Sequence, residues 1–577
     1  MGINSGADVS RRDLLLLGGL VVGTVLGEQV FSHLSKDLSP IGKVGDDTAQ
    51  SSLGSVNLPP LPALSIIALN RLTFGLRPGD VDAFNSLPGT TPTEKLQFFV
   101  DQQLNPSTID DSLFEAKLAS AKLAPLSKSL TQLWQDYFVN INTGNGPDYN
   151  LRLPPVTSVR AATILRAVFS KRQLQEVLTQ FWHNHFSVFG WDYEYASATW
   201  AHYDRDVIRS HALGNFRQML EAVGASPAML FYLNNYTNQA IGPNENYARE
   251  LFELHGLGAE NYLGTGPANQ VAKDTSGKPI GFVDEDIFAA ARCFTGWRVN
   301  DAIAAGHPEL TNSGEFLYFA SWHDTTVKTV LGQVIPADQP ALKDGRDVFD
   351  LIAAHPGTGR FIARKLCRRL IGDNPPQSVI DAAAAVFTAM KDAPDQLKQV
   401  VRTIILSDAF SSTWAQKIKT PIEVSMAVLR ATNVDFAAIS DAFFWTFNRM
   451  AQPFFGCRTP NGFADVKEAW LGTMSILNRW ALCNSLVGGG INTNGIAWTV
   501  NLVGQMPVNI QAPAAIADFW IQRLLERPMY PLSNRDYIVD FMAQGRNPSF
   551  ALTSAEIALL LPRMVELIMM SPDFQWR

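Results

Sequence analysis

The chain has 577 residues, and its 47 Lys and Arg against 54 Asp and Glu give a formal net charge of −7. Hydrophobic residues make up 46% and charged residues 18%, which excludes an intrinsically disordered protein. The acidic balance offers no basic footprint for nucleic acid, and the length excludes a disulfide-stapled mini-domain. The composition therefore predicts a large globular protein with an extensive buried core.

The N-terminal segment is predicted to be an export signal. Arg11 and Arg12 directly precede a mildly apolar stretch over 14–26, the layout of a twin-arginine signal peptide. A helix of that length covers about 20 Å, whereas a bilayer core needs roughly 30 Å. We therefore assign 1–34 to the signal and 35–63 to a flexible linker, and expect a periplasmic or extracellular protein that meets the membrane only through its signal. A Sec-type signal or an uncleaved anchor is the alternative.

From residue 64 onward, apolar residues recur at the three- and four-residue steps of amphipathic helices, for example from Val207 to Val223 and from Phe361 to Leu370. Strand-like alternation is scarce, but the segments 316–319 and 328–332 flank a turn and predict a small β-hairpin. The expected fold class is mainly α: a large multi-helix globular fold with a β-hairpin insertion and two packed helical lobes, 64–300 and 301–577. Later helices are expected over 414–431, 464–488 and 513–526.

A His-x-His motif at His183 and His185 is the first candidate site. In an extended segment both imidazoles would point to one side, whereas on a helix they lie about 200° apart. Because the preceding block looks helical, we expect the pair to straddle a helix end, where the imidazoles can still converge. The motif predicts a metal site, and two packed or capping histidines are the alternative.

A polar helix face within 244–255 is the second candidate. At 100° per residue, Glu250 and Glu253 share this face with Arg249. Two carboxylates one turn apart can bind a metal or act as acid and base, while an ion pair between Arg249 and Glu253 is the simpler alternative. His255 lies on the apolar side but just before a glycine, where we expect the helix to end and the imidazole to become available as a ligand.

Asp204 and His211 are the third candidate, because residues seven apart on a helix fall on nearly the same face. A carboxylate that orients an imidazole is a common acid–base arrangement, and a buried polar network is the alternative.

A basic row is the fourth candidate: Arg360, Arg364 and Arg368 recur at four-residue spacing and could receive an anion or an acidic partner surface. Ion pairs with the protein's own carboxylates are the alternative. The four cysteines are far apart and form no C-x-x-C motif, which excludes a zinc ribbon or a thioredoxin-like site.

Several short segments occur in one order along the chain: Leu69–Gly75, Phe181–Phe186, Asn244–His255, Arg292–Trp297, His323–Asp324, Arg360–Arg369 and Thr459–Gly462. As an ordered set they resemble the bacterial exported family catalogued as domain of unknown function 1800. The resemblance covers roughly 65–575 and implies an exported protein, often with a twin-arginine signal, but no activity. It supports 64–577 as one family unit.

Three functions are consistent with these patterns. The first is a metal-dependent enzyme, a hydrolase or oxidoreductase acting on a small molecule or polymer, with a loop over 262–282 covering its cleft. Its Zn, Fe or Mn ligands would be His183, His185, Glu250 and His255, and its acid–base residues Glu250, Glu253, Asp204 and His211. The second is a non-catalytic binding, maturation or scaffold protein for another exported protein. The third is a carbohydrate-active enzyme that pairs Glu250 with Asp204 or Glu253.

Overall fold

The computed structural model describes residues 58–141, 148–192, 195–275, 277–301, 310–436, 444, 447–487 and 500–577. The predicted signal peptide and most of the linker, 1–57, lie outside the described residues. The first helix begins at Leu64. Within the described ranges, no helix is both long enough and apolar enough to span a membrane.

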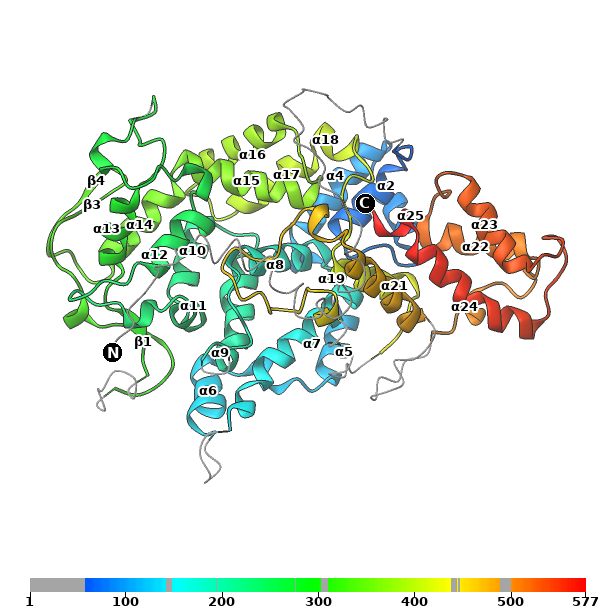
Figure 1. Cartoon of the computed structure of the whole chain (residues 1–577), viewed down its shortest axis with the longest axis horizontal. Coiled ribbons are helices and arrows are strands. Elements are labelled where there is room, and N and C mark those ends of the chain that lie inside the picture. The colour runs from blue at the N-terminus through cyan, green and yellow to red at the C-terminus, as the bar shows by residue number, and fades with distance from the viewer. Residues whose placement is uncertain are drawn as a thin grey trace, which may run out of the picture. The chain divides into compact units, whose positions relative to one another are not determined.

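Helices dominate the fold, as the sequence predicts (Figure 1). The N-terminal third contains α2 (Leu64–Leu72), α3 (Asp80–Asn85), α4 (Pro92–Gln103), α5 (Ser112–Ser120), α6 (Leu130–Trp134), α7 (Pro154–Phe169), α8 (Gln173–Phe186) and α9 (Ala196–His202). The middle contains α10 (Phe216–Gly224), α11 (Pro227–Tyr232), α12 (Asn246–Glu250), α13 (Asp284–Cys293), α14 (Lys343–Ala353), α15 (Pro356–Leu370), α16 (Gln377–Ala389), α17 (Gln396–Ile405) and α18 (Asp408–Ser411). The last third contains α19 (Pro421–Ala431), α21 (Thr473–Val487), α22 (Pro513–Leu525), α23 (Ser533–Ala543), α24 (Ser554–Met570) and α25 (Pro572–Gln575).

The helices expected over 414–431, 464–488 and 513–526 correspond to α19, α21 and α22, but α19 and α21 begin several residues later. Local chemistry explains the start of α19. Pro421 occupies the first turn, and the Thr420 side chain caps the helix in a reciprocal pair with Glu423.

Both segments predicted as strands form strands, but they do not pair with each other. The first, β2 (Phe316–Tyr318), pairs antiparallel with β1 (Trp297–Val299), so that Leu317 lies opposite Arg298. The second, β3 (Lys328–Val330), pairs with β4 (Gln333–Ile335). Leu331 and Gly332 between them have φ values of +50° and +71°, as a tight two-residue hairpin turn requires. Because this turn reverses the chain directly after β3, β3 pairs with the strand that follows it and not with β2.

The buried apolar residues form two clusters. The members of the first cluster lie between Ile66 and Trp414. Those of the second lie mainly between Ile422 and Phe574, and it also includes residues of α7 together with Phe74, Phe114 and Val177. The boundary between the two clusters along the chain therefore lies near residue 415, whereas the predicted boundary between the two lobes is at residue 300. The reason is packing: α14 lies against α10 and α17 against α4, so helices after 300 complete the first core.

Helix α8 runs through the first cluster and positions the candidate site. It packs against α2, α4 and α7, with Leu174, Leu178 and Trp182 among its buried residues. In Figure 1, α8 lies between α9 and the α15–α17 group, and the C-terminus lies near α2. There the main chain of Arg577 exchanges hydrogen bonds with Lys417, and its guanidinium donates to the carbonyl of Arg71.

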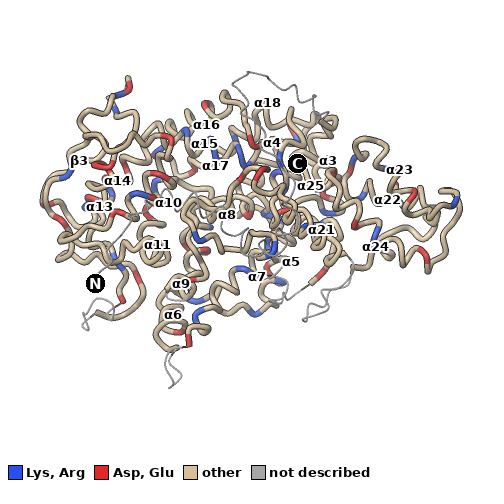
Figure 2. The backbone as a smooth tube through the Cα atoms, in the orientation of Figure 1, with Lys and Arg blue, Asp and Glu red and all other residues tan. Residues whose placement is uncertain are grey.

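Charged residues of opposite sign lie close together over much of the described chain (Figure 2). Several of these pairs are buried, including Lys417 with Asp373 at 2.9 Å and Arg298 with Asp301 at 2.7 Å. A buried charge is costly without a partner, so these contacts explain how the fold accommodates charge inside its cores.

Candidate functional site

Segments that carry the family resemblance meet at the C-terminal end of α8. The side chain of Asn184 donates to the carbonyl of Phe463 at 2.9 Å and accepts from its N–H at 2.8 Å. The hydroxyl of Ser187 donates to the carbonyl of Thr459 at 2.9 Å. Gly462 has a φ of +74°, and a Cβ there would lie 2.2 Å from the carbonyl oxygen of Asn184. The loop Thr459–Gly462 is therefore held tightly against α8.

Both motif histidines lie inside α8, so the expected helix end between them is wrong. Their imidazoles point to different partners, as a helix dictates for residues two apart. Nε2 of His183 lies 3.0 Å from Oδ1 of Asp204. Nε2 of His185 instead lies 3.0 Å from the carbonyl oxygen of His255. The two histidines thus belong to separate contact networks.

Asp204 is buried and surrounded by cationic groups. Burial by itself would raise the pKa of this carboxyl, but Arg209, the hydrogen bond with His183 and Arg166 together lower it below its usual value. Arg209 is also paired with Glu176 at 2.7 Å, so its charge is shared. An ionised Asp204 can only accept a hydrogen bond, so it favours a proton on Nε2 of His183, and in the neutral form of that tautomer Nδ1 carries the lone pair.

A pocket of about 80 Å³ lies beside His183, between α8 and the segment 452–463. The side chains of Gln180, His183 and Cys457 all line it. Among the described residues, neither Nδ1 of His183 nor Nε2 of Gln180 has a hydrogen-bond partner, and both atoms are buried. Buried polar atoms without partners are costly, so they mark a place where a bound group would be stabilised. Cys457 forms no disulfide and is partly exposed, and its sulfur lies 3.5 Å from both the carbonyl oxygen and the hydroxyl of Thr459.

On the other side of the α8 end, His185 contacts Lys365 from α15. The ammonium of Lys365 donates to Nδ1 of His185 at 2.9 Å. Burial lowers the pKa of Lys365 to about 8. Burial and the nearby Lys365 lower the pKa of His255 to about 3 and that of His185 well below its usual range. Both imidazoles are therefore neutral at physiological pH, and Lys365 loses its proton more readily than an exposed lysine does.

The four residues predicted as metal ligands do not surround one ion. His183 contacts Asp204, whereas His185 contacts the carbonyl oxygen of His255 and the ammonium of Lys365. Within the described ranges, no group of three or more His, Cys, Asp or Glu side chains is arranged to hold a metal ion. Metal binding remains a prediction from the sequence, which elemental analysis of the folded protein would test.

The predicted carboxylate pair divides between two environments. Glu253 is ion-paired with Arg249 at 3.3 Å, which is the simpler alternative that the sequence left open. Glu250, at the end of α12, lies near Tyr232. Burial raises the pKa of that phenol, and the neighbouring Cys457 and Glu250 raise it further. Glu250 and Cys457 thus both lie near Tyr232.

Asp204 and His211 do not form the expected pair. Residues Tyr203–Arg209 form a π-helical turn, η7, and a separate helix, α10, begins after Asn215. A π turn changes the angular spacing on which the prediction rests. Nδ1 of His211 consequently lies 2.8 Å from the carbonyl of Val207, while Asp204 faces His183.

The arginine row is partly occupied by the protein's own acceptors. Arg364 is paired with Glu260 at 2.7 Å, and Arg368 donates to the carbonyl of Asp373 at 3.2 Å. Arg360 is exposed. The predicted covering loop, 262–282, lines a different pocket of about 650 Å³ together with β4 and α14. It does not line the pocket beside His183.

Sequence reasoning missed three residues of this site: Gln180, Cys457 and Lys365. Each lies in or next to a segment that carries the resemblance, because Gln180 immediately precedes Phe181–Phe186, Cys457 is two residues before Thr459, and Lys365 lies within Arg360–Arg369. That proximity was the available signal. Their partners, however, are distant in sequence and could not be read from spacing.

Comparison with known proteins adds a family but no activity. No curated protein and no solved structure is significantly similar to the chain. The family model described as protein of unknown function, DUF1800, matches residues 67–576, which is most of the chain. The protein therefore belongs to the DUF1800 family.

Proposed function

We propose that the protein is an acyl-transfer enzyme, acting as a hydrolase on an ester, thioester or amide, with Cys457 as nucleophile and His183 as general base. One observation carries the proposal: Asp204 binds one nitrogen of His183, the other nitrogen has no partner among the described residues, and His183 and Cys457 line the same pocket. A base oriented by a carboxylate beside a nucleophile is the general requirement for nucleophilic catalysis.

The proposed reaction assigns one role to each side chain. Nδ1 of His183 takes the proton of the Cys457 thiol, and the sulfur attacks the acyl carbon. The imidazolium, stabilised by Asp204, then gives the proton to the leaving alcohol, thiol or amine. Water, activated by His183, hydrolyses the resulting thioester and restores the thiol. The free Nε2–H of Gln180 is the candidate donor to the developing oxyanion.

The same contacts favour this chemistry over the other enzymes expected from the sequence. Asp204 already has two arginines and an imidazole around it, which suits an orienting carboxylate better than a metal ligand or a glycosidase acid. Glu253 is held by Arg249. The alternative role, as a binding partner of another exported protein, is tested by a pull-down experiment.

The test is cysteine-resolved alkylation of the full chain by iodoacetamide at pH 7, read by mass spectrometry. We expect His183→Gln to slow alkylation of Cys457 by about tenfold or more, because the thiol loses its base. His211→Gln is the matched control and should leave the rate unchanged, since Nδ1 of this histidine is hydrogen-bonded locally, to Ser210 and the carbonyl of Val207. Equal alkylation rates in His183→Gln and the parent would contradict the proposed base.

Activity is then measured on p-nitrophenyl esters of increasing acyl length and on a simple thioester. Cys457→Ala should abolish turnover, and His183→Gln should lower kcat by about 10²–10⁴. Gln180→Ala should lower kcat by about 10² with little change in KM. Full turnover by Cys457→Ala would refute the proposed nucleophile. Thermal melts of each variant show whether it is folded.

We also propose that the protein is exported by the twin-arginine route, on the basis of Arg11, Arg12 and the apolar stretch that follows them. Replacing both arginines by lysine should retain the protein in the cytoplasm, because the translocase reads the arginine pair. Cell fractionation and immunoblotting measure this. Unchanged export of the double variant would instead indicate a Sec-type signal.

A further inference from the structure

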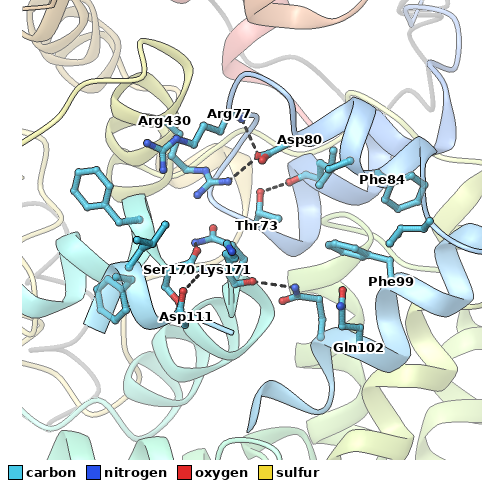
Figure 3. Close-up of a pocket in the computed structure, with 18 of the residues that line it drawn as sticks. Thr73, Arg77, Asp80, Phe84, Phe99, Gln102, Asp111, Ser170, Lys171 and Arg430 are labelled. Carbon is cyan, nitrogen blue, oxygen red and sulfur yellow. Dashed lines mark hydrogen bonds and ion pairs between the residues drawn. The ribbon is translucent and has the colours of Figure 1, made fainter. Parts of the chain in front are cut away.

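A larger pocket lies at the opposite end of α8. Its volume is about 600 Å³, within the roughly 300–1,000 Å³ range of small-molecule sites. It is lined by α3, α4 and α5, by Gln173 at the start of α8, and by Arg430 at the end of α19. Figure 3 shows the guanidinium groups of Arg77 and Arg430 on one side of this pocket and Phe84 and Phe99 on the other.

The walls of this pocket are aromatic and aliphatic. Phe84, Phe99 and Phe114 are almost completely buried by their neighbours yet still line the pocket. Leu113, which also lines it, is 81% exposed. An exposed apolar side chain beside aromatic walls is stabilised when an apolar ligand covers it.

The charged side of the pocket carries an excess of positive charge. Four cationic and three anionic side chains line it, although the chain as a whole is acidic. Oδ2 of Asp80 accepts the guanidinium of Arg430 at 2.8 Å, whereas Arg77 donates only its backbone N–H to this oxygen, at 2.9 Å. The Arg77 guanidinium itself donates to the amide oxygen of Asn433, a neutral acceptor.

Three other charged side chains of the lining, Lys117, Asp435 and Asp111, have partners within the protein. Lys117 is paired with Asp435 at 2.5 Å. Asp111 accepts the hydroxyl of Ser170 and the backbone N–H of Lys171. Burial lowers the pKa of Arg430, Asp80 offsets part of that effect, and the neighbouring Arg77 lowers the pKa further, as expected for two like charges near one counter-charge. An additional anion beside Arg77 would relieve this repulsion.

We propose that this pocket binds an amphipathic organic anion, with a carboxylate or phosphate group at Arg77 and an apolar chain along Phe84, Phe99 and Phe114. The amphipathic lining matches such a ligand at both ends: Arg77 offers guanidinium donors that suit a planar acidic group, and the phenylalanines exclude water from the chain. The site is separate from the Cys457 pocket, so this inference does not depend on the proposed acyl transfer.

The test is isothermal titration of the full chain with four ligands that share a twelve-carbon tail, below their micelle-forming concentrations. We expect saturable one-to-one binding of dodecanoate or dodecyl phosphate, with dodecanol at least tenfold weaker and dodecyltrimethylammonium not binding. The comparison of dodecanoate with dodecyl phosphate distinguishes a fatty-acid-like ligand from one with a phosphate headgroup. Raising NaCl from 50 to 500 mM should weaken the binding of the two anions and leave the affinity for dodecanol unchanged.

Two variants locate the binding in this pocket. Arg77→Gln should lower the affinity for the preferred anion about tenfold without changing the affinity for dodecanol. Arg77→Lys should retain part of the anion affinity that Arg77→Gln loses. Ala83→Trp, on the exposed side of α3 at the pocket lining, should block all binding by filling the space. Arg535→Gln, at a partly exposed, ion-paired arginine on α23, is the matched control. Equal affinities for dodecanoate, dodecyl phosphate and dodecanol, unchanged binding by Ala83→Trp, or no saturable binding would each overturn the proposal.

Discussion

Glu423 offers the sharpest test of how the fold is held together. It is buried near the start of α19 and binds Arg369 from α15 and Arg577 at the C-terminal end, the latter at 2.7 Å. Its other oxygen accepts the backbone N–H of Thr420 at 2.8 Å. The perturbation is Glu423→Gln, which keeps the shape and this last hydrogen bond but removes the charge between two arginines.

The magnitude follows from the environment of the carboxylate. Burial by itself would raise the pKa of Glu423, but Arg369 and Arg577 outweigh it and lower the pKa from 4.5 to about 2. At about 1.4 kcal/mol for each tenfold change in proton affinity, this is worth about 3 kcal/mol of folding free energy. Breaking a buried ion pair from one side typically costs about 3–5 kcal/mol. We therefore expect Glu423→Gln to lose about 3–5 kcal/mol at pH 7.

The pH dependence has a definite sign. Because the pKa is lower in the folded state, the stabilisation is complete above about pH 4.5 and is lost as the pH falls toward 2. Urea unfolding followed by circular dichroism should show the gap between parent and variant shrinking by about 2 kcal/mol between pH 7 and pH 3. Glu468→Gln, at an exposed position, is the control. A loss below about 1 kcal/mol at pH 7, or an equal loss at both pH values, would refute the reasoning.

Two further predictions concern the α8 end. Gly462→Ala should cost more than about 2 kcal/mol in a thermal melt, because it combines the positive φ with a clash against the Asn184 carbonyl. Gly545→Ala, with a φ of +76° but nothing within 4 Å, should cost only about 1 kcal/mol, and equal costs would argue against the close contact. Lys365→Met should be at least as stable as the parent at pH 7, since the lysine pKa is lowered by burial to about 8. Between about pH 8 and 10.5 the lysine is deprotonated in the folded state but still protonated in the unfolded state, so the parent should become more stable relative to the variant. A constant stability difference over that range would contradict the lowered pKa of Lys365.

Helix positions were accessible from the sequence because their causes are local. Periodic apolar residues, the capping pair of Thr420 and Glu423, and Pro421 in the first turn all act within a few residues. The mainly helical class and the family both follow from such features. Residues with unusual chemistry, such as His183 and Asp204, could also be selected one at a time.

Their partnerships were not accessible, because pairing depends on how helices pack. His183 meets Asp204 across 21 residues, and Asn184 meets Phe463 across 279. Two π-helical turns, Tyr203–Arg209 and Leu251–His255, shift the faces that a regular helix would present. The sequence by itself thus determined the helices, the family and some of the candidate residues, such as His183 and Asp204. Only the tertiary structure decided which of them share a pocket, since long-range packing and not spacing brings Gln180, His183 and Cys457 together.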